Sequence, residues 1–286
     1  MRGRWQAGLV SAILVTALAV PGVASSAGSA GLTAAPAGTR AMWLWGGEPA
    51  AEVVEWAAGQ QVSEIFVHVS ADVLTNGELA RLQEMNEQAA ALDIKLRALG
   101  GDPGWATDHP AALAWQRAVV STGIFSGIHI DVEPYLTDGW TQNLQGTQTS
   151  FLKLLDKMRT ASALPIEADV PFWYGQYKLG RKNFADEVLR RVNGVTVMSY
   201  RDTGTGPNSM LDVSQDWLTR GKTAGKRVRL GAETGPLADC SYCTFAEEGT
   251  AHLDAELSKV DAATRSTAAF AGIAVHHYGS WRSLPA

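Results

Sequence analysis

The sequence is poor in cysteine. Its only two cysteines, Cys240 and Cys243, are three positions apart among 286 residues. Two thiols do not complete the four-ligand shell of a structural zinc site. A thioredoxin-like redox pair needs the start of a helix that follows a strand, and this segment lacks that context. The sequence therefore predicts a Cys240–Cys243 disulfide that closes a small loop, as in exported proteins.

The chain also lacks a surplus of positive charge and an apolar run long enough to span a bilayer. Its net charge of −5 gives no reason to expect nucleic acid or an anionic membrane as a partner. The apolar run Leu9–Val20 falls short of the ~20 residues that a span needs. It follows a basic start and precedes small residues, so we expect residues 1–30 to be a secretory signal peptide, with an uncleaved anchor as the alternative. The mature protein is then secreted, without stable membrane association, and residues 31–39 form a flexible lead-in.

From residue 40 onward, a strand, a loop and an amphipathic helix follow one another repeatedly. Strands are expected at 40–45, 63–70, 95–99, 126–133, 165–171, 194–200, 227–232 and 271–277. Helices are expected at 48–60, 77–92, from Asp108 as N-cap, and at 148–161, 181–192, 213–224 and 246–263. Such alternation in an α/β chain predicts a parallel sheet.

Eight such units match a closed (β/α)8 TIM barrel, here as a single domain over residues 40–286. The competing fold is an open doubly wound sheet. For nucleotide binding, that fold carries a glycine fingerprint after its first strand, where this chain has Trp43-Leu-Trp-Gly-Gly47. Few residues follow the eighth strand, so the last helix is expected to be reduced or missing, with the final residues or the lead-in covering the gap.

The stretch Ser126–Tyr135 has the strongest pattern in the chain. As a strand it places His129, Asp131 and Glu133 on one face and the apolar residues between them on the other. Pro134 cannot donate to a sheet ladder, so the strand should stop there. Glu133 is then expected at the carboxyl end of a barrel strand, where barrel enzymes keep their chemistry.

In a barrel, the carboxyl ends of all strands open on the same face. Carboxylates, aromatic rings and a few histidine and arginine residues gather at these ends, together with Gly100 and Gly101. The candidate set is Trp43, Trp45, His68, His129, Asp131, Glu133, Tyr135, Asp169, Trp173, Tyr200, Arg201, Glu233, His276 and Tyr278. Paired acids and flat rings are what hydrolysis of a sugar polymer requires, so we expect a carbohydrate to bind there. Adjacent histidines on a strand point to opposite faces, so at most one of His276 and His277 joins this set, and no metal site is predicted.

At these residues the chain resembles glycoside hydrolase family 18 and related chitinase-like barrels. That family ends its fourth strand in Asp-Gly-hydrophobic-Asp-x-Asp-x-Glu, and this chain has Ser126-Gly-Ile-His-Ile-Asp-Val-Glu133. The family's Ser-x-Gly-Gly corresponds to Ala98-Leu-Gly-Gly101, and its Met-x-Tyr-Asp to Met198-Ser-Tyr-Arg201. The resemblance covers three strands in the correct order.

The resemblance implies a role for each matched residue and requires no metal or organic cofactor. Glu133 would be the general acid, Asp131 would orient the 2-acetamido group that attacks the anomeric carbon, and Tyr200 would hydrogen-bond that group's oxygen. Two carboxylates two residues apart on a strand have Cα atoms about 6.6 Å apart. Their repulsion raises the pKa of one of them, which keeps a proton where an acid is needed.

Three departures from the family pattern keep alternatives open. His129 replaces the first Asp of the motif, so we expect a buried imidazole hydrogen-bonded behind Asp131. Arg201 replaces the Asp after the tyrosine, and His276-His277-Tyr278 stands where the family usually has a tryptophan. One alternative is a glycosidase of another family, in which Glu133 works with Asp169 or Glu233. The other is a lectin-like barrel that binds carbohydrate without catalysis.

Overall fold

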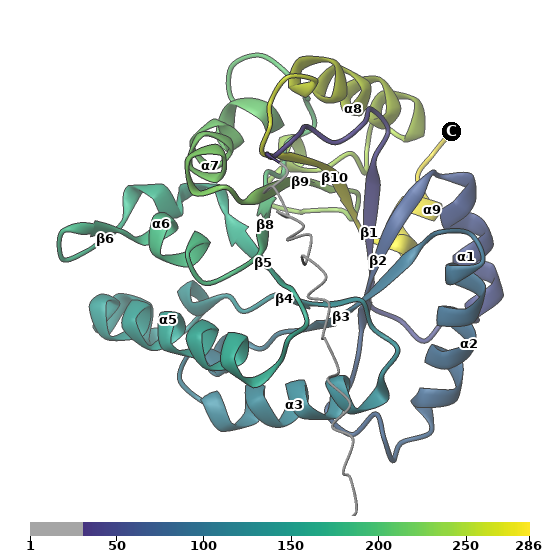
Figure 1. Cartoon of the computed structure of the whole chain (residues 1–286). Coiled ribbons are helices and arrows are strands. Elements are labelled where there is room, and N and C mark those ends of the chain that lie inside the picture. The colour runs from purple at the N-terminus through teal and green to yellow at the C-terminus, as the bar shows by residue number, and fades with distance from the viewer. Residues whose placement is uncertain (1–30) are drawn as a thin grey trace, which may run out of the picture. The chain divides into compact units, whose positions relative to one another are not determined.

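The computed structural model describes residues 31–286, and its strands close into a barrel with helices outside it (Figure 1). The barrel strands are β1 (Arg40–Leu44), β2 (Val62–His68), β3 (Lys95–Gly100), β4 (Gly127–Ile130), β5 (Ile166–Pro171), β8 (Gly194–Met198), β9 (Arg227–Glu233) and β10 (Phe270–His276). They follow the closed order β1-β10-β9-β8-β5-β4-β3-β2, and all neighbours are parallel. The predicted (β/α)8 barrel is confirmed, whereas the predicted signal peptide lies outside the described residues.

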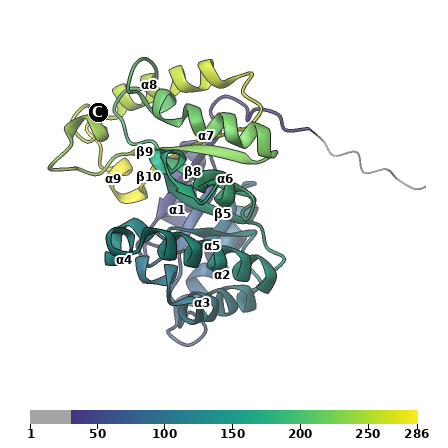
Figure 2. The ribbon, with the colours of Figure 1, turned by 90° about the vertical axis from the view of Figure 1, so that its left-hand side faces the viewer.

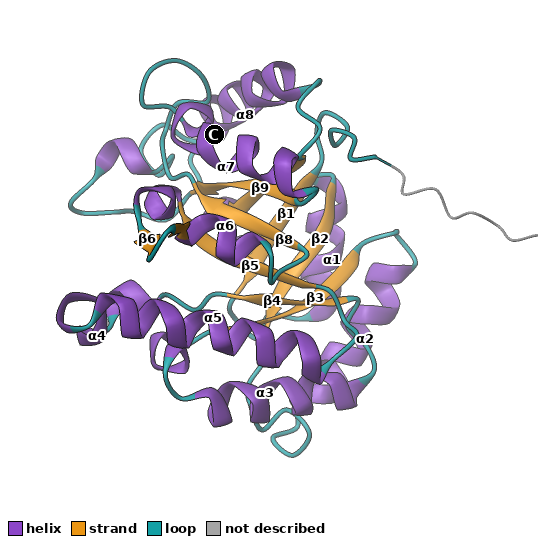
Figure 3. Cartoon of the chain, turned by 60° about the vertical axis from the view of Figure 1, so that its left-hand side comes forward, coloured by secondary structure: helices purple, strands orange, loops and turns teal. Residues whose placement is uncertain are grey.

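Helices surround the strands on all sides, as Figure 3 shows in purple around orange. They are α1 (Ala50–Gly59), α2 (Glu78–Ala90), α3 (His109–Thr122), α4 (Asp138–Gln142), α5 (Leu144–Ala161), α6 (Phe184–Leu189), α7 (Met210–Ala224), α8 (Thr250–Thr264) and α9 (Tyr278–Arg282). The expected N-cap of α3 is confirmed, because the Asp108 carboxylate accepts a hydrogen bond from the Ala111 N–H at 3.2 Å. Within residues 31–286, no helix combines the length and apolar character needed to cross a membrane.

Four helices begin three or more residues away from their predicted starts. Helix α7 begins three residues earlier than predicted, and α8 begins four residues later. Helix α5 begins four residues earlier than predicted, because the Asn143 side chain caps it by accepting a hydrogen bond from the Gly146 N–H. Helix α6 is shorter than predicted, because an antiparallel hairpin of β6 (Lys178–Leu179) and β7 (Lys182–Asn183) occupies its expected first turn. Asn183 then caps the remaining helix through the Ala185 N–H.

The last helix is reduced to α9, as predicted. Its Trp281 packs edge-on against Trp56 of α1, with ring centroids 4.8 Å apart, so five residues close the gap beside β10 and β1. The lead-in was expected to be flexible, but it is bound to the barrel. The Ala35 N–H donates to the Phe270 carbonyl at 2.9 Å, and Arg227 donates to the Thr33 carbonyl at 2.8 Å.

The core has two parts because barrel strands are covered on both faces. Outward-facing side chains such as Leu44, Ile65 and Ile128 form one large cluster under the helices. Inside the barrel, a small apolar group fills the middle, and we call it the apolar plug. It consists of Ala41, Trp43, Phe66, Leu99 and Ala274. The polar residues of the predicted site lie beyond this plug, towards the carboxyl ends of the strands.

Below the plug lies a layer of charged side chains that the sequence analysis did not predict. Arg229 pairs with Glu64 at 3.0 Å and with Glu167 at 3.1 Å, and Arg97 pairs with Glu64 at 2.8 Å. Burial works against ionisation of Glu167, but the charges of Arg229 and Arg97 outweigh it and hold the pKa of Glu167 well below its usual value. Two acids and two arginines thus compensate one another's charges at the amino ends of the strands.

Candidate active site

The carboxyl ends of the strands form one mouth of the barrel. In Figure 2, α4 and α9, which follow β4 and β10, both lie at the left end of the barrel. The regular strand β4 stops at Ile130, three residues earlier than predicted, although the Asp131 N–H still donates to the Gly100 carbonyl at 3.1 Å. Asp131 and Glu133 therefore stand in the loop just above β4, where they face the mouth.

The pair Gly100-Gly101 allows the loop to approach β3 closely. A Cβ atom on Gly101 would lie 2.0 Å from the Asp131 carbonyl oxygen, and one on Gly100 would lie 2.3 Å from the Trp115 ring. No side chain fits at such distances, so only glycine lets the backbone of Asp131 lie against β3. The position of Asp131 depends on Gly101, whereas Gly100 makes room for the Trp115 ring.

The carboxyl group of Asp131 lacks hydrogen-bond partners within the described part of the chain. Its Oδ1 atom is buried and makes no hydrogen bond within the described part of the chain. Burial, followed by the negative charges of Asp169 and Glu133, raises the pKa of Asp131 well above its usual value. Asp131 therefore retains a proton at pH values where an exposed aspartate has lost it.

Glu133 lines an open cavity of about 290 Å³ in the mouth, together with Tyr135, Trp173, Tyr200 and Arg201. The Tyr135 hydroxyl donates a hydrogen bond to Oε1 of Glu133. Burial and the adjacent Glu133 carboxylate raise the pKa of Tyr135, so its hydroxyl stays protonated. The Tyr135 ring packs edge-on against Trp173, with centroids 5.2 Å apart, which fixes the hydroxyl beside the carboxylate.

Tyr200 enters the mouth from the loop after β8. Its neighbour Ser199 donates to the Gly231 carbonyl of β9 at 2.9 Å, which anchors the turn. Burial, followed by the charges of Glu233, Asp169, Asp131 and Glu133, raises the pKa of the Tyr200 phenol well above its usual value. Tyr200 is therefore a neutral O–H donor among carboxyl groups that come from three other strands.

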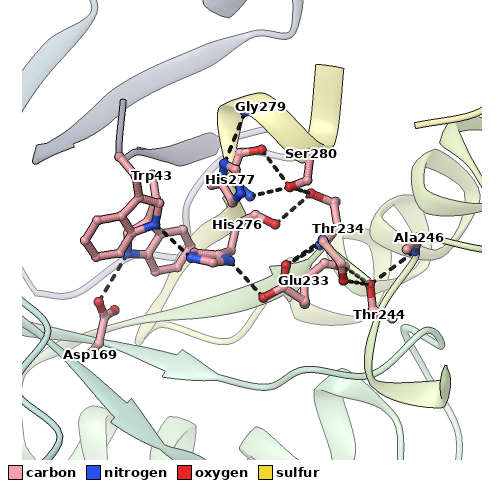
Figure 4. Close-up of polar contacts among 12 residues, drawn as sticks. Trp43, Asp169, Glu233, Thr234, Thr244, Ala246, His276, His277, Gly279 and Ser280 are labelled. Atoms are coloured by element: carbon pink, nitrogen blue, oxygen red, sulfur yellow. Dashed lines mark hydrogen bonds and ion pairs between the residues drawn. The ribbon is translucent and has the colours of Figure 1, made fainter. Parts of the chain in front are cut away.

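A chain of hydrogen bonds joins Trp45, His276 and Glu233 across the mouth (Figure 4). Trp45 Nε1 donates to His276 Nε2 at 2.9 Å, and His276 Nδ1 lies 2.8 Å from Glu233 Oε2. A tryptophan N–H is only a donor, so His276 Nε2 must accept and its proton resides on Nδ1. The other Glu233 oxygen accepts from the backbone N–H groups of Thr234 and Gly235, at 2.9 and 2.6 Å.

His277 follows the last residue of β10, and its ring centroid lies 5.1 Å from that of His276, so the predicted alternation to opposite faces does not extend to this pair. The imidazole of His276 enters the mouth, whereas His277 Nδ1 accepts a hydrogen bond from the Gly279 N–H and caps α9 (Figure 4). The peptide bond between them is cis. Neither the His277 side chain nor the α9 turn reaches the Glu133 cavity.

The predicted disulfide is confirmed and lies on the rim of the mouth. The Cys240 and Cys243 sulfurs are 2.02 Å apart, with Cα atoms 5.3 Å apart. Cys243 lines the Glu133 cavity, and the neighbouring Tyr242 is 54% exposed beside Arg201. The short loop therefore shapes the edge of the cavity.

Five residues expected to bind substrate are buried instead, among them Glu233, which is 5% exposed. Trp43, His129 and Asp169 are at most 3% exposed and lie in or directly above the apolar plug, and Tyr278 is 2% exposed against Trp56. Because they present no free surface, we correct their role to support of the site. His68 is exposed but lies beside Trp45, on a separate hollow of about 410 Å³ next to the mouth.

The expected hydrogen bond from His129 to Asp131 is absent. The His129 ring stacks on Phe66, with centroids 3.7 Å apart, and its Nε2 lies 2.9 Å from Asp169 Oδ1 without the alignment of a hydrogen bond. Burial lowers the pKa of His129 to about 4, so its imidazole is neutral. Burial also raises the pKa of Asp169, whose Oδ2 accepts from Trp43 Nε1 at 3.2 Å. Burial thus disfavours the charged form of both members of this deep pair.

Several residues of the mouth were missed from the sequence. Leu237 lines the Glu133 cavity, and the backbone amides of Thr234 and Gly235 hold Glu233. Apolar loop residues carry no signal of their own in a single sequence. A backbone N–H group also gives no signal in a sequence. The order Glu-Thr-Gly at a strand end nevertheless allows the glutamate carboxylate to accept hydrogen bonds from the next two backbone N–H groups.

Comparison with known proteins supports the fold. No protein-family model matches the sequence, and no curated protein matches it. Among solved structures, the spore cortex-lytic enzyme SleL of Bacillus cereus superposes with a TM-score of 0.55 at 9% identity, over 86% of this chain and 73% of that one. A GH18 chitinase from Pseudoalteromonas aurantia gives a TM-score of 0.54 at 12% identity, over 85% and 94%. The chain therefore shares its barrel fold with these two proteins, and the resemblance to the chitinase-like barrels is confirmed for the fold.

Proposed function

We propose that this chain is a glycoside hydrolase that cleaves a glycan containing N-acetylhexosamine, with Glu133 as the general acid. The observation that carries the proposal is the position of the Glu133 carboxyl. It lines a cavity in the barrel mouth, accepts a hydrogen bond from Tyr135, and lies close to the buried Asp131 and Tyr200. A general acid beside a second carboxyl group and a neutral phenol provides the groups that cleavage of a glycosidic bond requires.

Asp131 and Glu133 together would handle one proton. Burial and the negative charges of Asp169 and Glu133 raise the pKa of Asp131, which favours its protonated form. A substrate N–H that donates to Asp131 would stabilise the Asp131 carboxylate. The proton then resides on Glu133, which delivers it to the departing glycosidic oxygen.

The nucleophile in this scheme is the substrate's own 2-acetamido oxygen. It attacks the anomeric carbon as the glycosidic bond breaks, and water later opens the resulting ring with retention of configuration. The Tyr200 hydroxyl makes no hydrogen bond to the residues that the structure describes, and its raised pKa keeps it a donor. It would donate to the acetamido oxygen and hold it in line for attack. The chitinase from Pseudoalteromonas aurantia, which shares the fold, agrees with an N-acetylated substrate.

The geometry favours this scheme over a glycosidase that pairs Glu133 with Asp169 or Glu233. A nucleophilic or basic carboxylate needs an oxygen that faces the sugar. Asp169 is buried and accepts a hydrogen bond from Trp43, and both oxygens of Glu233 already accept hydrogen bonds from His276, Thr234 and Gly235. Asp131 is half-buried, whereas Asp169 is 3% exposed, and neither Asp131 oxygen accepts a hydrogen bond from the described residues, so Asp131 is the second acid of our proposal.

The test compares Glu133→Gln with the wild type on soluble N-acetylated and non-acetylated oligosaccharides. Removal of the general acid should lower kcat by about 10²- to 10⁴-fold, and substrates without the acetamido group should not be cleaved. The exposed Glu55→Gln on α1 is the matched control and should retain wild-type turnover. Unchanged turnover by Glu133→Gln would exclude Glu133 as the acid. Binding of oligosaccharides without turnover of any of them would identify a lectin-like barrel.

We also propose that the protein is secreted. The basic start, short apolar run and small residues of segment 1–30 support export, as does the Cys240–Cys243 disulfide. Mass spectrometry of the protein from its host should find the mature chain outside the cell, with a new N-terminus near residue 30. A full-length chain retained in the cell would contradict this proposal.

A further inference from the structure

Arg201 is a fixed cation on the rim of the Glu133 cavity. Its Nη1 donates to the Tyr200 carbonyl at 2.6 Å, and its Nε donates to Asn208 Oδ1 at 3.1 Å. The guanidinium carbon lies 5.0 Å from the centre of the Phe172 ring and 5.6 Å from that of Tyr242. Two hydrogen bonds and two aromatic rings therefore hold the group in place before any ligand arrives.

The charge of Arg201 has no anionic partner in the described structure. Its acceptors are a carbonyl, an amide oxygen and the Cys243 sulfur at 3.8 Å, all of them neutral. No salt bridge joins Arg201 to a carboxylate within residues 31–286, and its Nη2 donates no hydrogen bond there. Of the ten described residues that line this cavity, Arg201 is the one cation, and Glu133 is the one acid.

An arginine placed this way is suited to a specific chemical group. Its planar N–H groups match the two oxygens of a carboxylate, and the pairing is stronger than a hydrogen bond between neutral groups. Neutral sugars have no need of such a cation, whereas the acids at the centre of the mouth would repel a negative group placed directly over them. An anionic substituent is therefore best accommodated at the rim of the cavity, away from Glu133.

We propose that Arg201 binds a carboxylate carried by the glycan, so that the substrate is an acidic polymer in which N-acetylhexosamine is combined with carboxylated sugars. This inference rests on the hydrolase proposed above. The carboxylate could be carried by an ether-linked lactyl group or by C6 of a uronic acid. Both present the same planar anion to Arg201, and separate substrates distinguish them.

The test measures kcat/KM of the full mature chain on three oligosaccharides of equal length. One is neutral and built of N-acetylglucosamine, one alternates with lactyl-ether sugars, and one alternates with uronic acids. We expect the wild type to prefer one of the carboxylated substrates over the neutral one. Arg201→Met, which keeps an apolar side chain between Phe172 and Tyr242, should lower the ratio of carboxylated to neutral kcat/KM by about 10- to 100-fold. The exposed Arg265→Met at the end of α8 should leave the ratio unchanged.

Two readouts separate this inference from the proposed activity. If the wild type cleaves none of the substrates, binding to Glu133→Gln and to Glu133→Gln with Arg201→Met is measured by calorimetry. Carboxylated oligosaccharides that bind more weakly to the double variant would support the role of Arg201 even without hydrolysis. A wild type that prefers the neutral substrate, or an Arg201→Met variant with an unchanged preference in both measurements, would overturn it.

Discussion

At the scale of single residues, the site depends on the absence of a side chain at Gly101. We expect Gly101→Ala to lower the free energy of unfolding by about 1–3 kcal/mol, as overpacking does. The reason is that the new Cβ would lie 2.0 Å from the Asp131 carbonyl, so the backbone of Asp131 must move. Activity should fall further than stability alone explains, because Asp131 leaves its place beside Glu133. Urea unfolding and kcat measured well below the unfolding temperature check the two effects.

The control for this variant is Gly47→Ala in the loop after β1. A Cβ atom on Gly47 would meet no atom within 4 Å, so stability and turnover should stay near the wild-type values. If Gly101→Ala behaved like Gly47→Ala in both measurements, the close approach of Asp131 to β3 would not matter for the site. The sequence alone predicted a tight approach at Gly100-Gly101, but not which atoms would meet there.

Alternation along a strand predicts which face a residue takes, but not how deep it lies. The spacing of His129, Asp131 and Glu133 placed all three on the inner face, and the structure agrees. It does not reveal that Trp43 and Phe66 fill the barrel at the level of His129, because that depends on the register between strands. The same limit explains why Asp169 was predicted to touch substrate although it is buried and hydrogen-bonded to Trp43.

At the scale of elements, the amino ends of the strands are held together by the charged layer of Glu64, Arg97, Glu167 and Arg229. We expect Arg229→Met to lower the free energy of unfolding by about 3–5 kcal/mol, because it leaves the buried Glu167 and the half-buried Glu64 with less compensation. The neighbouring Arg227→Met provides the control, since Arg227 is exposed and makes one hydrogen bond to the Thr33 carbonyl. Equal stability of the two variants in urea unfolding would contradict this account.

The ends of elements were predictable only where a local signal marks them. Asp108 capped its helix as predicted, since the capping pattern is local. Asn143 provides an equally local cap for α5, but the six residues from Gln145 to Ser150 include no large apolar side chain, which obscured the helical period. The β6–β7 hairpin turns at Gly180, which has a φ of 62°, and a glycine among basic residues was not sufficient to separate a hairpin from the start of a helix.

At the scale of the whole molecule, closure of the barrel was predictable because it follows from counting eight strand–helix units. What could not be predicted is how the chain covers the last gap. Trp281 of α9 and Trp56 of α1 come from opposite ends of the domain, and their contact depends on the ring already being closed. The barrel therefore positions acids from β4, β5 and β9 around one mouth, although they are far apart in sequence.

The stability of the whole molecule should fall in acid partly because of one buried imidazole. Burial lowers the pKa of His129 to about 4, so the unfolded chain binds a proton there, near pH 6.5, before the folded chain does. Acid therefore favours unfolding, and this stabilising contribution is lost as the pH falls from 6.5 to 4. Between pH 7 and pH 4.5, the wild type should lose about 2 kcal/mol more free energy of unfolding than His129→Asn, which has no group that titrates at this position. Urea unfolding at the two pH values measures this difference.

The buried Asp131 and Asp169 have raised pKa values and therefore act in the opposite direction, but both proteins retain them. Equal acid losses in the two proteins would mean that His129 is not held neutral by the barrel interior.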